Sequence, residues 1–140
     1  MELKMRITQE ADYAVRIIDC IARRSKRLDA RSISEATGVT LRFTLKILRK
    51  LTHAGILRSY KGVSGGYELS REPAKINLRE VIEAVDGPIV ISRCLSGELP
   101  CSNIEDKKLC YYHNIFAEVS KDIRDKFEGI SFSSDSEVKE

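Results

Sequence analysis

Apolar residues recur every three or four positions along most of this chain, which is the period of an amphipathic α-helix. After Thr8 the first apolar stripe begins at Ala11 and runs to Ala22, and charged residues occupy the opposite face. Thr8 is a suitable N-cap, and acidic residues in the first turn complement the helix dipole. The pattern predicts a first helix that packs its apolar side against a core.

Two short helices joined by a turn are predicted next. The first covers residues 30–37, with Asp29 as its N-cap and Gly38 as the left-handed residue that ends it. The second follows its N-cap Thr40 and runs to about Ala54. A helix, a short glycine-containing turn and a second helix form a helix-turn-helix pattern.

The second of these helices has one cationic face. This face is wholly cationic, with no acidic residue to neutralise it, and apolar residues fill most of the remaining arc; the basic residues are Arg42, Lys46, Arg49 and Lys50. A solvated surface helix more often mixes acidic and basic residues to gain pairs one turn apart. The pattern therefore favours contact with a nucleic acid over a solvated face.

A glycine-rich hairpin is predicted directly after this helix. Residues 56–60 and 67–70 have the composition of short strands, and the segment KGVSGG between them gives the tip unusual backbone freedom. The tip lacks the Gly-Lys-Ser/Thr ending of a nucleotide-binding loop. Because Arg58 and Lys61 are close by, we interpret the hairpin as a basic wing beside the cationic helix, with a plain surface hairpin as the alternative.

The rear of the chain contains one short and one long predicted helix. Asn77 caps the short helix, and Glu80 completes a capping box. The long helix, within residues 111–130, carries its apolar residues on a narrow stripe that needs a partner. We expect that partner to be both the first helix of the same chain and the same helix of a second chain. Residues 131–140 have the composition of a disordered, solvated tail.

These elements predict a mainly α fold in two segments. Residues 1–75 form a winged helix-turn-helix DNA-binding domain with a small two-stranded β wing. Residues 76–130 add the short helix, a cysteine-containing loop and a long C-terminal dimerisation helix. The whole chain has 140 residues, enough for one domain or for a small domain with an oligomerisation element.

Composition and charge narrow the class of protein. No apolar run approaches the roughly 20 residues that span a bilayer, and the N-terminal segment lacks a secretory core, so we expect a cytoplasmic protein without membrane contact. Residues 1–71 hold 15 Lys and Arg against 7 Asp and Glu, whereas residues 72–140 hold 9 against 14. The resulting charges of +8 and −5 fit a front half that meets a polyanion, and a solvated basic surface explains them equally well.

Soft metal ligands are concentrated in one short segment. Three of the four cysteines and one of the two histidines fall within residues 94–113, namely Cys94, Cys101, Cys110 and His113. Thiols stay reduced in the cytoplasm, so the cluster indicates metal binding or redox chemistry instead of a disulfide framework. The fourth cysteine, Cys20, lies in the first helix, where we expect a small packing residue.

Taken in order, these features resemble the bacterial IscR/NsrR-type winged-helix transcription regulators. The resemblance covers about residues 5–130 and rests on the segments MRITQEADYAVR, TLRFTLKILRKLTHAGIL and KGVSGGYEL and on the late three-cysteine segment. It implies a homodimeric repressor that binds a pseudo-palindromic DNA operator, with two reading helices about one helical turn of DNA apart. It also implies that the regulator senses redox state, nitric oxide or iron–sulfur status.

The reading helix and the wing supply the expected DNA contacts. Arg42 is the best base-reading candidate, because its guanidinium fork fits guanine O6 and N7. The basic residues farther along the helix are expected to contact phosphates, which predicts steep salt dependence. The expected set is Thr40, Arg42, Phe43 and Lys46 at the start of the reading helix, Arg49 and Lys50 on its cationic face, and Arg58, Lys61, Gly65 and Gly66 in the wing.

The resemblance further implies an iron–sulfur cluster held by three cysteines, here Cys94, Cys101 and Cys110. In the IscR type, a histidine three residues after the last cysteine completes the ligand set, which matches His113 and favours a 2Fe-2S cluster. In the NsrR type, an aspartate of the other subunit completes a 4Fe-4S cluster, and Asp12 stands at that position. Pairing of Asp12 with a neighbouring arginine on the helix surface is an equal alternative. The cysteines span more residues than in the well-known members, which leaves the cluster type open.

Three other interpretations of the cysteines remain. Structural zinc sites usually contain a cysteine pair two to four residues apart, and this segment has none. Some relatives lack a cluster and respond to a partner protein or to thiol oxidation. A thiolate–imidazole pair of Cys110 and His113 would suit a thiol-dependent enzyme. No carboxylate or oxyanion-hole turn is evident nearby, so we expect no enzymatic activity.

Overall fold

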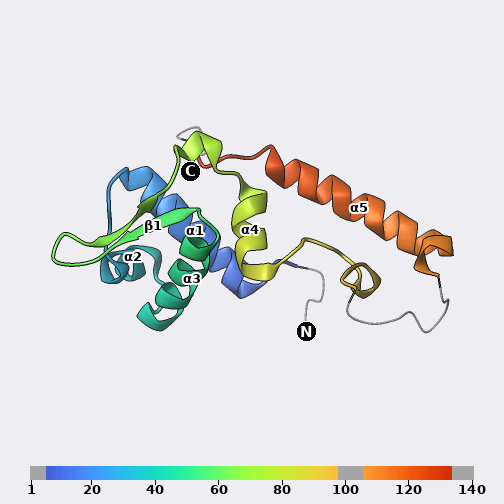
Figure 1. The fold of residues 1–140 in the computed structure, drawn as a ribbon, viewed down its shortest axis with the longest axis horizontal. Coiled ribbons are helices and arrows are strands. Elements are labelled where there is room, and N and C mark those ends of the chain that lie inside the picture. Colours follow the sequence, from blue (N-terminus) through green and yellow to red (C-terminus); the bar gives the residue numbers. More distant parts are fainter. Residues whose placement is uncertain (1–5, 98–105, 134–140) are drawn as a thin grey trace.

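The structure, a computed structural model, describes residues 6–97 and 106–133. Figure 1 shows a helical assembly with one small hairpin. The elements, in chain order, are α1 (Gln9–Arg24), α2 (Ala30–Thr37), α3 (Leu41–His53), β1 (Leu57–Tyr60), β2 (Gly66–Leu69), η1 (Pro73–Lys75), α4 (Leu78–Asp86), η2 (Arg93–Leu95), η3 (Lys107–Leu109) and α5 (Tyr111–Glu128). The predicted mainly α fold with a two-stranded wing is confirmed.

Local hydrogen bonds fix where the helices begin. The side chain of Thr8 accepts a hydrogen bond from the Ala11 N–H (3.0 Å), and that of Asp29 accepts one from the Ser32 N–H (2.7 Å). An N-cap of this kind typically contributes about 1 kcal/mol. Asn77 and Glu80 form the expected capping box at the start of α4. The starts of these helices were therefore predictable from short sequence signals.

Helix α1 lies at the centre of the hydrophobic core. Its isoleucines are buried between α3 on one side and α4 on the other. A fully buried side chain of this size contributes about 1.5–3 kcal/mol of hydrophobic free energy. The largest side chains of this core are Ile17, Ile18 and Ile21 of α1, Ile33 of α2, Ile47, Leu48 and Leu51 of α3, Ile56, Ile76, and Val81 of α4. One core thus joins the front and rear segments of the chain.

The hairpin is attached to the loop between α1 and α2. β1 and β2 pair antiparallel, with Leu57 opposite Leu69 and Tyr60 opposite Gly66. On the other side of β2, the Leu28 N–H donates to the Tyr67 carbonyl (3.0 Å) and the Tyr67 N–H donates to the Leu28 carbonyl (2.7 Å). These two bonds hold the base of the wing against the helical core.

Helix α5 packs on α4, which lies between it and α1 (Figure 1). The expectation that the first helix would directly cover the apolar stripe of α5 is therefore wrong, because α4 occupies that place. Backbone bonds also tie the connection after α4 to α5. The Ile91 N–H donates to the buried hydroxyl of Ser120 (3.0 Å), and Arg124 donates to the Ile89 carbonyl (3.0 Å).

The folded part of the chain extends beyond the expected start of the tail at residue 131. Ser131 forms a bridge with Asn77, and Phe132 is buried with two backbone bonds to the η1 region. The burial of this aromatic side chain in the core, together with the two backbone bonds, explains this order. Residues 134–140 of the expected tail lie outside the described residues. Within the described chain, none of the helices is long and apolar enough to span a bilayer.

Candidate functional site

Helix α3 presents most of its basic residues to solvent. Arg42, Lys46 and Arg49 are exposed, whereas Ile47, Leu48 and Leu51 on the other side are buried in the core. The predicted amphipathic character is confirmed, although the buried face is narrower than the apolar arc of the helix. Phe43 and Leu45 keep 43% and 42% of their surfaces exposed, so they lie outside the core and widen the exposed face.

An acidic residue of α1 reaches the cationic face of α3. Glu10 lies 2.8 Å from Lys50 Nζ through Oε2 and 3.2 Å from Lys46 Nζ through Oε1. Burial raises the pKa of the Glu10 carboxyl, but the hydrogen bonds and charges of the two lysines outweigh it and leave the pKa below its usual value. The face is therefore less cationic than the sequence of α3 alone indicates. Sequence reasoning missed this contact because it joins two helices.

An aromatic contact supports the start of α3. The rings of Phe43 and Tyr13 meet edge to face with their centroids 6.1 Å apart. The Arg16 guanidinium lies 5.4 Å from the centroid of the Tyr13 ring. Such aromatic pairs are worth about 0.5–1.5 kcal/mol beyond their buried area. Phe43 is thus held in place while much of its surface stays available to a ligand.

The wing is held by Arg27, a residue that the sequence did not single out. Its guanidinium carbon lies 3.5 Å from the centroid of the Tyr60 ring, and Nη1 donates to the Ser64 carbonyl (3.1 Å). The Tyr60 hydroxyl donates in turn to Glu68 (2.7 Å). A cation–π contact and a hydrogen bond from one side chain fix both strands and the tip relative to the core.

The glycines of the wing have a structural role. At Gly66, with φ of +139°, a Cβ atom would lie 2.6 Å from the Leu28 carbonyl oxygen. A Cβ at Gly65 would collide with the Tyr60 carbonyl oxygen. Only glycine allows these backbone approaches. Arg58 and Lys61, in contrast, are exposed on the wing and free of such constraints.

Two of the four expected metal ligands meet in the described structure. Cys94, in η2, and His113, in the first turn of α5, approach to 3.2 Å between Sγ and Nδ1. The Ser92 hydroxyl lies 3.1 Å from the same sulfur. Cys110 is the N-cap residue of α5, one turn before His113, and Cys101 lies outside the described residues. The bonds that tie residues 89–91 to α5 place Cys94 beside His113.

The described residues do not assemble a complete metal site. No group of three or more His, Cys, Asp or Glu side chains within residues 6–97 and 106–133 could hold a metal ion. Asp12, the alternative fourth ligand, pairs with Arg16 at 2.8 Å on the surface of α1, as one interpretation expected. Two thiolates and an imidazole remain a donor set that suits iron or an iron–sulfur cluster.

Cys20 is a packing residue, as predicted. It is partly buried against the core, and burial raises the pKa of its thiol although Arg24 partly opposes the shift. A higher pKa keeps the thiol protonated and unreactive. Cys20 is therefore separated from the chemistry of the rear cysteines.

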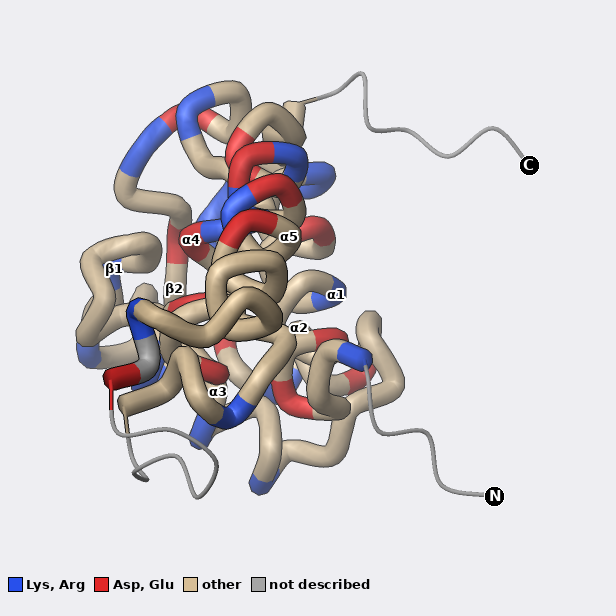
Figure 2. The backbone as a smooth tube through the Cα atoms, turned by 90° about the vertical axis from the view of Figure 1, so that its right-hand side faces the viewer, with Lys and Arg blue, Asp and Glu red and all other residues tan. Residues whose placement is uncertain are grey.

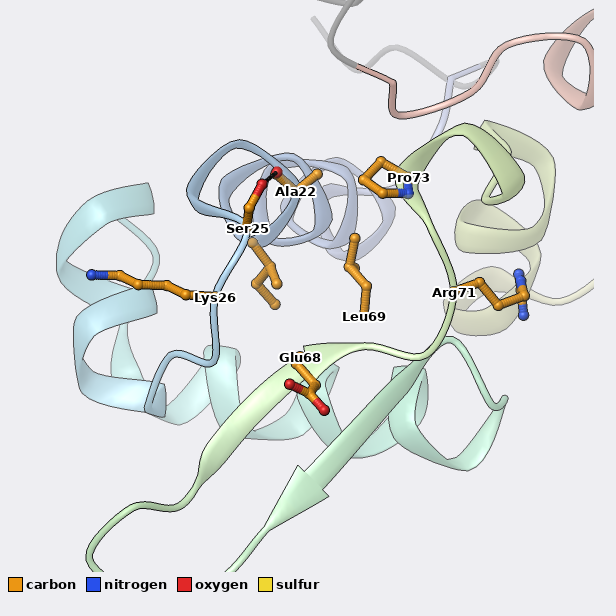
Figure 3. A pocket seen from close by; sticks show the side chains of 8 residues that line it. Ala22, Ser25, Lys26, Glu68, Leu69, Arg71 and Pro73 are labelled. Carbon is orange, nitrogen blue, oxygen red and sulfur yellow. Dashed lines mark hydrogen bonds between the residues drawn. The ribbon is translucent and has the colours of Figure 1, made fainter.

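A hollow of about 240 Å³ lies between the end of α1 and β2 (Figure 3). The charged side chains at its border, Lys26, Glu68 and Arg71, point away from its centre. Glu68 accepts a hydrogen bond from Tyr60, and Arg71 is paired with Glu80. The hollow thus has an apolar floor without converging polar groups, which does not favour a small-molecule site.

Comparison with known proteins gives a consistent set of relatives. A model of the Rrf2 family, described as iron-dependent transcriptional regulators, matches residues 7–134. An rrf2-like HTH-type transcriptional regulator of Rhodobacter capsulatus is 34% identical over 120 residues, which cover 81% of this chain and 80% of the relative. The HTH-type transcriptional regulator IscR of Vibrio vulnificus is 30% identical over 139 residues, which cover 96% of this chain and 80% of the relative. The fold is similar to CymR, the global cysteine regulator of B. subtilis, with a TM-score of 0.71 at 19% identity over 91% of this chain and 93% of that chain.

Proposed function

The chain belongs to the Rrf2 family of transcriptional regulators, and from that premise we propose that it is a homodimeric repressor that binds a pseudo-palindromic operator. The observation that carries the proposal is the exposed pair of Arg42 and Arg49 on α3, next to the wing. Exposed cations on a rigid helix with a basic hairpin at its end suit the major groove and the flanking phosphates.

The two ends of the α3 face have different roles in this proposal. Thr40, Arg42 and Phe43 lie at the N-terminal end, which in helix-turn-helix proteins contacts base edges. Arg42 reads a guanine and Phe43 packs on apolar base edges such as a thymine methyl group. Arg49 on α3 and Arg58 and Lys61 on the wing bind phosphates, which adds affinity without sequence information.

The second copy of the chain binds along α5. The first seven residues of this helix, 111–117, include no Lys, Arg, Asp or Glu, whereas acidic and basic residues alternate along the rest of it (Figure 2). Tyr112, Phe116 and Val119 share one face at helical spacing and stay 66%, 38% and 40% exposed. An exposed apolar face of this kind indicates a protein interface, and a two-fold dimer matches a palindromic operator.

Cys94, Cys110 and His113 are proposed to hold an iron–sulfur cluster together with Cys101. The approach of the Cys94 sulfur to the His113 nitrogen supports this ligand set, and His113 as a ligand favours the 2Fe-2S type. When bound, the cluster would supply sensitivity to oxidants, nitric oxide or iron supply. A 4Fe-4S cluster with Asp12 of the second chain is the other form of the same proposal.

A second candidate is a cluster-free regulator controlled by a partner protein or by thiol oxidation. One specific observation favours it: the Cys94 sulfur already has a polar partner in the Ser92 hydroxyl, 3.1 Å away. The similarity in fold to the cysteine regulator CymR is compatible with this form. Both candidates share the DNA-binding surface and differ only in what the rear cysteines bind.

Anaerobic purification followed by absorption spectroscopy and analysis of iron and acid-labile sulfide separates the two candidates. We expect a coloured protein that loses its iron and sulfide in Cys110→Ser and changes its spectrum in His113→Ala. Cys20→Ser is the matched control and should keep both, because Cys20 packs against the core. A change in Asp12→Ala instead of His113→Ala would indicate the 4Fe-4S form. A colourless wild-type protein that binds its operator would overturn the cluster proposal and leave the cluster-free regulator.

A further inference from the structure

We propose that Glu10 is an affinity-limiting residue of the recognition surface, which withdraws Lys46 and Lys50 from phosphate binding and so restrains the affinity of the reading helix for DNA. The inference rests on the proposed function of α3. It adds a residue of α1 to the recognition surface. It also changes the role of the two lysines that the sequence assigned to DNA contact.

The geometry of Glu10 is that of a clamp between two helices. Oε2 accepts a hydrogen bond from Lys50 Nζ at 2.8 Å, and Oε1 lies 3.2 Å from Lys46 Nζ. The Glu10 side chain is only 20% exposed, and none of the described groups makes a well-formed hydrogen bond to Oε1. One carboxylate is thus shared between two ammonium groups, and the weaker of its two contacts is the one to Lys46.

The two lysines differ in how far they are withdrawn. The Lys50 side chain is 37% exposed and hydrogen-bonded, whereas the Lys46 side chain is 57% exposed and only at ion-pair distance. Arg42 and Arg49 are exposed on the same helix, and the structure gives Glu10 no contact to either of them. The clamp therefore acts on the middle of the reading helix and leaves the base-reading Arg42 at its start unchanged.

This arrangement lowers the phosphate-binding part of the affinity and leaves the base-reading part unchanged. Affinity for arbitrary duplex comes from counterions released when lysines and arginines neutralise phosphates, so each withdrawn lysine lowers it. Discrimination between sequences comes from contacts to base edges, which the clamp does not touch. Because the operator is also bound through its phosphates, Glu10 lowers the affinity for both kinds of DNA by about the same factor, and the ratio between them remains set by the base contacts.

The test compares wild type and Glu10→Gln on two probes across a salt series, by fluorescence anisotropy. One probe is a duplex of arbitrary sequence; the other is an operator selected by the wild-type protein from a random-sequence pool. For Glu10→Gln we expect about three- to tenfold tighter binding to the arbitrary duplex near 0.1 M salt, with a log–log salt slope steeper by about one. Affinity for the operator should rise by about the same factor, so the ratio of the two affinities stays unchanged.

Asp19→Asn is the matched control. Asp19 is another acidic residue of α1 in an ion pair, but its partner is Arg23, away from α3. This variant should leave both affinities and the salt slope unchanged. In a Lys46→Gln, Lys50→Gln background, Glu10→Gln should have no further effect, because the clamp has lost both partners.

Several outcomes would overturn the inference. The inference is wrong if folded Glu10→Gln binds arbitrary duplex with the affinity and salt slope of the wild type. It is also wrong if Glu10→Gln raises the affinity equally in the Lys46→Gln, Lys50→Gln background. If Glu10→Gln does not fold, Glu10→Asp keeps the charge but shortens the reach to Lys50, and it should show a smaller gain in the same direction. A wild-type protein that selects no operator would instead contradict the proposed function, which separates the two failures.

Discussion

The helix-turn-helix half and the α5 half of this molecule use apolar residues in opposite ways. In α1 and α3, most of the apolar side chains are buried in one core, and Ile17, Ile47 and Leu48 have no exposed surface. In α5, Tyr112 and Phe116 share an exposed face although the helix is as regular as α1. A helix buries its apolar stripe against other elements of its own chain wherever these offer an apolar surface. The comparison teaches that α1 and α3 bury most of their apolar side chains in the core of their own chain, whereas α5 keeps an apolar surface that suits another molecule.

The largest difference should appear when the same truncation is made in both halves. Leu48→Ala removes a fully buried side chain and should lower the free energy of unfolding by about 2–5 kcal/mol. Leu109 lies just before α5, and its side chain is 74% exposed. Leu109→Ala should therefore change the free energy of unfolding by no more than about 0.5 kcal/mol. Urea unfolding measures both. Equal losses of unfolding free energy in the two variants would contradict the contrast between the buried apolar side chains of α3 and the exposed ones near α5.

A charge placed on the open face should break the dimer. Phe116→Asp would bury an unpaired carboxylate in the proposed seam, so we expect subunit association to weaken by roughly 30-fold or more. Sedimentation equilibrium measures the association, and Glu118→Lys, an exposed position on the other side of α5, should leave it unchanged. If Phe116→Asp remains as dimeric as the wild type, α5 is not the seam.

Substitution of two arginines of α3 should distinguish contacts to bases from contacts to phosphates. Arg42→Ala should weaken operator binding by about 10- to 100-fold, because a bidentate contact to guanine is lost, and arbitrary duplex should be affected less. Arg49→Ala should weaken both probes alike and lower the salt slope by about one. Anisotropy titrations on both probes test the pair. Loss of the same factor on both probes in Arg42→Ala would remove it from the base-reading set.

A helix cap in the connection between the halves should have a moderate effect. Asn77→Ala removes both the cap and its reciprocal bond with Glu80 and should cost about 1 kcal/mol. Thermal unfolding checks this value. Ser96→Ala, an exposed substitution in the turn after η2, should change stability by less than about 0.5 kcal/mol. A loss for Asn77→Ala as small as that for Ser96→Ala would show that the capping box does not stabilise α4.

The smallest expected effect is the pH dependence of the Glu10 clamp. Burial raises the pKa of Glu10, but Lys50 and Lys46 lower it by a larger amount. The pKa is therefore lower in the folded chain than in the unfolded one, and folding favours the ionised carboxyl. The stabilisation is therefore present above the ordinary pKa of an unfolded glutamate and is lost as the pH falls through the lowered pKa of the folded chain. The difference in unfolding free energy between wild type and Glu10→Gln should be about 1 kcal/mol or less at neutral pH and should vanish in acid. A difference that grows in acid would have the wrong sign.

Local sequence signals predicted the helices, their caps and the wing, because these depend on residues a few positions apart. Asp29 and Gly38 define α2 within its own segment. Contacts between distant residues were not predictable in this way. The Glu10 clamp joins α1 to α3, and Arg27 reaches the wing tip across 37 positions. The burial of Phe132 likewise depends on where α4 and η1 lie in space.

The candidate sites show the same division. Exposure of Arg42 and Arg49 followed from helical periodicity alone, since buried and exposed faces repeat along α3. The proximity of Cys94 to His113 depends on bonds from Ser120 and Arg124 to the chain after α4, which no local motif reports. Spacing indicated which residues to combine, and the three-dimensional packing decided which of them meet.

Selection of duplexes from a random-sequence pool by the anaerobically purified chain tests the central claim most directly. The account predicts enrichment of a two-fold symmetric sequence whose half-sites lie about one helical turn apart, matching a dimer with two copies of α3. Recovery of no preferred sequence, or of a single unsymmetrical site bound by a monomer, would contradict it.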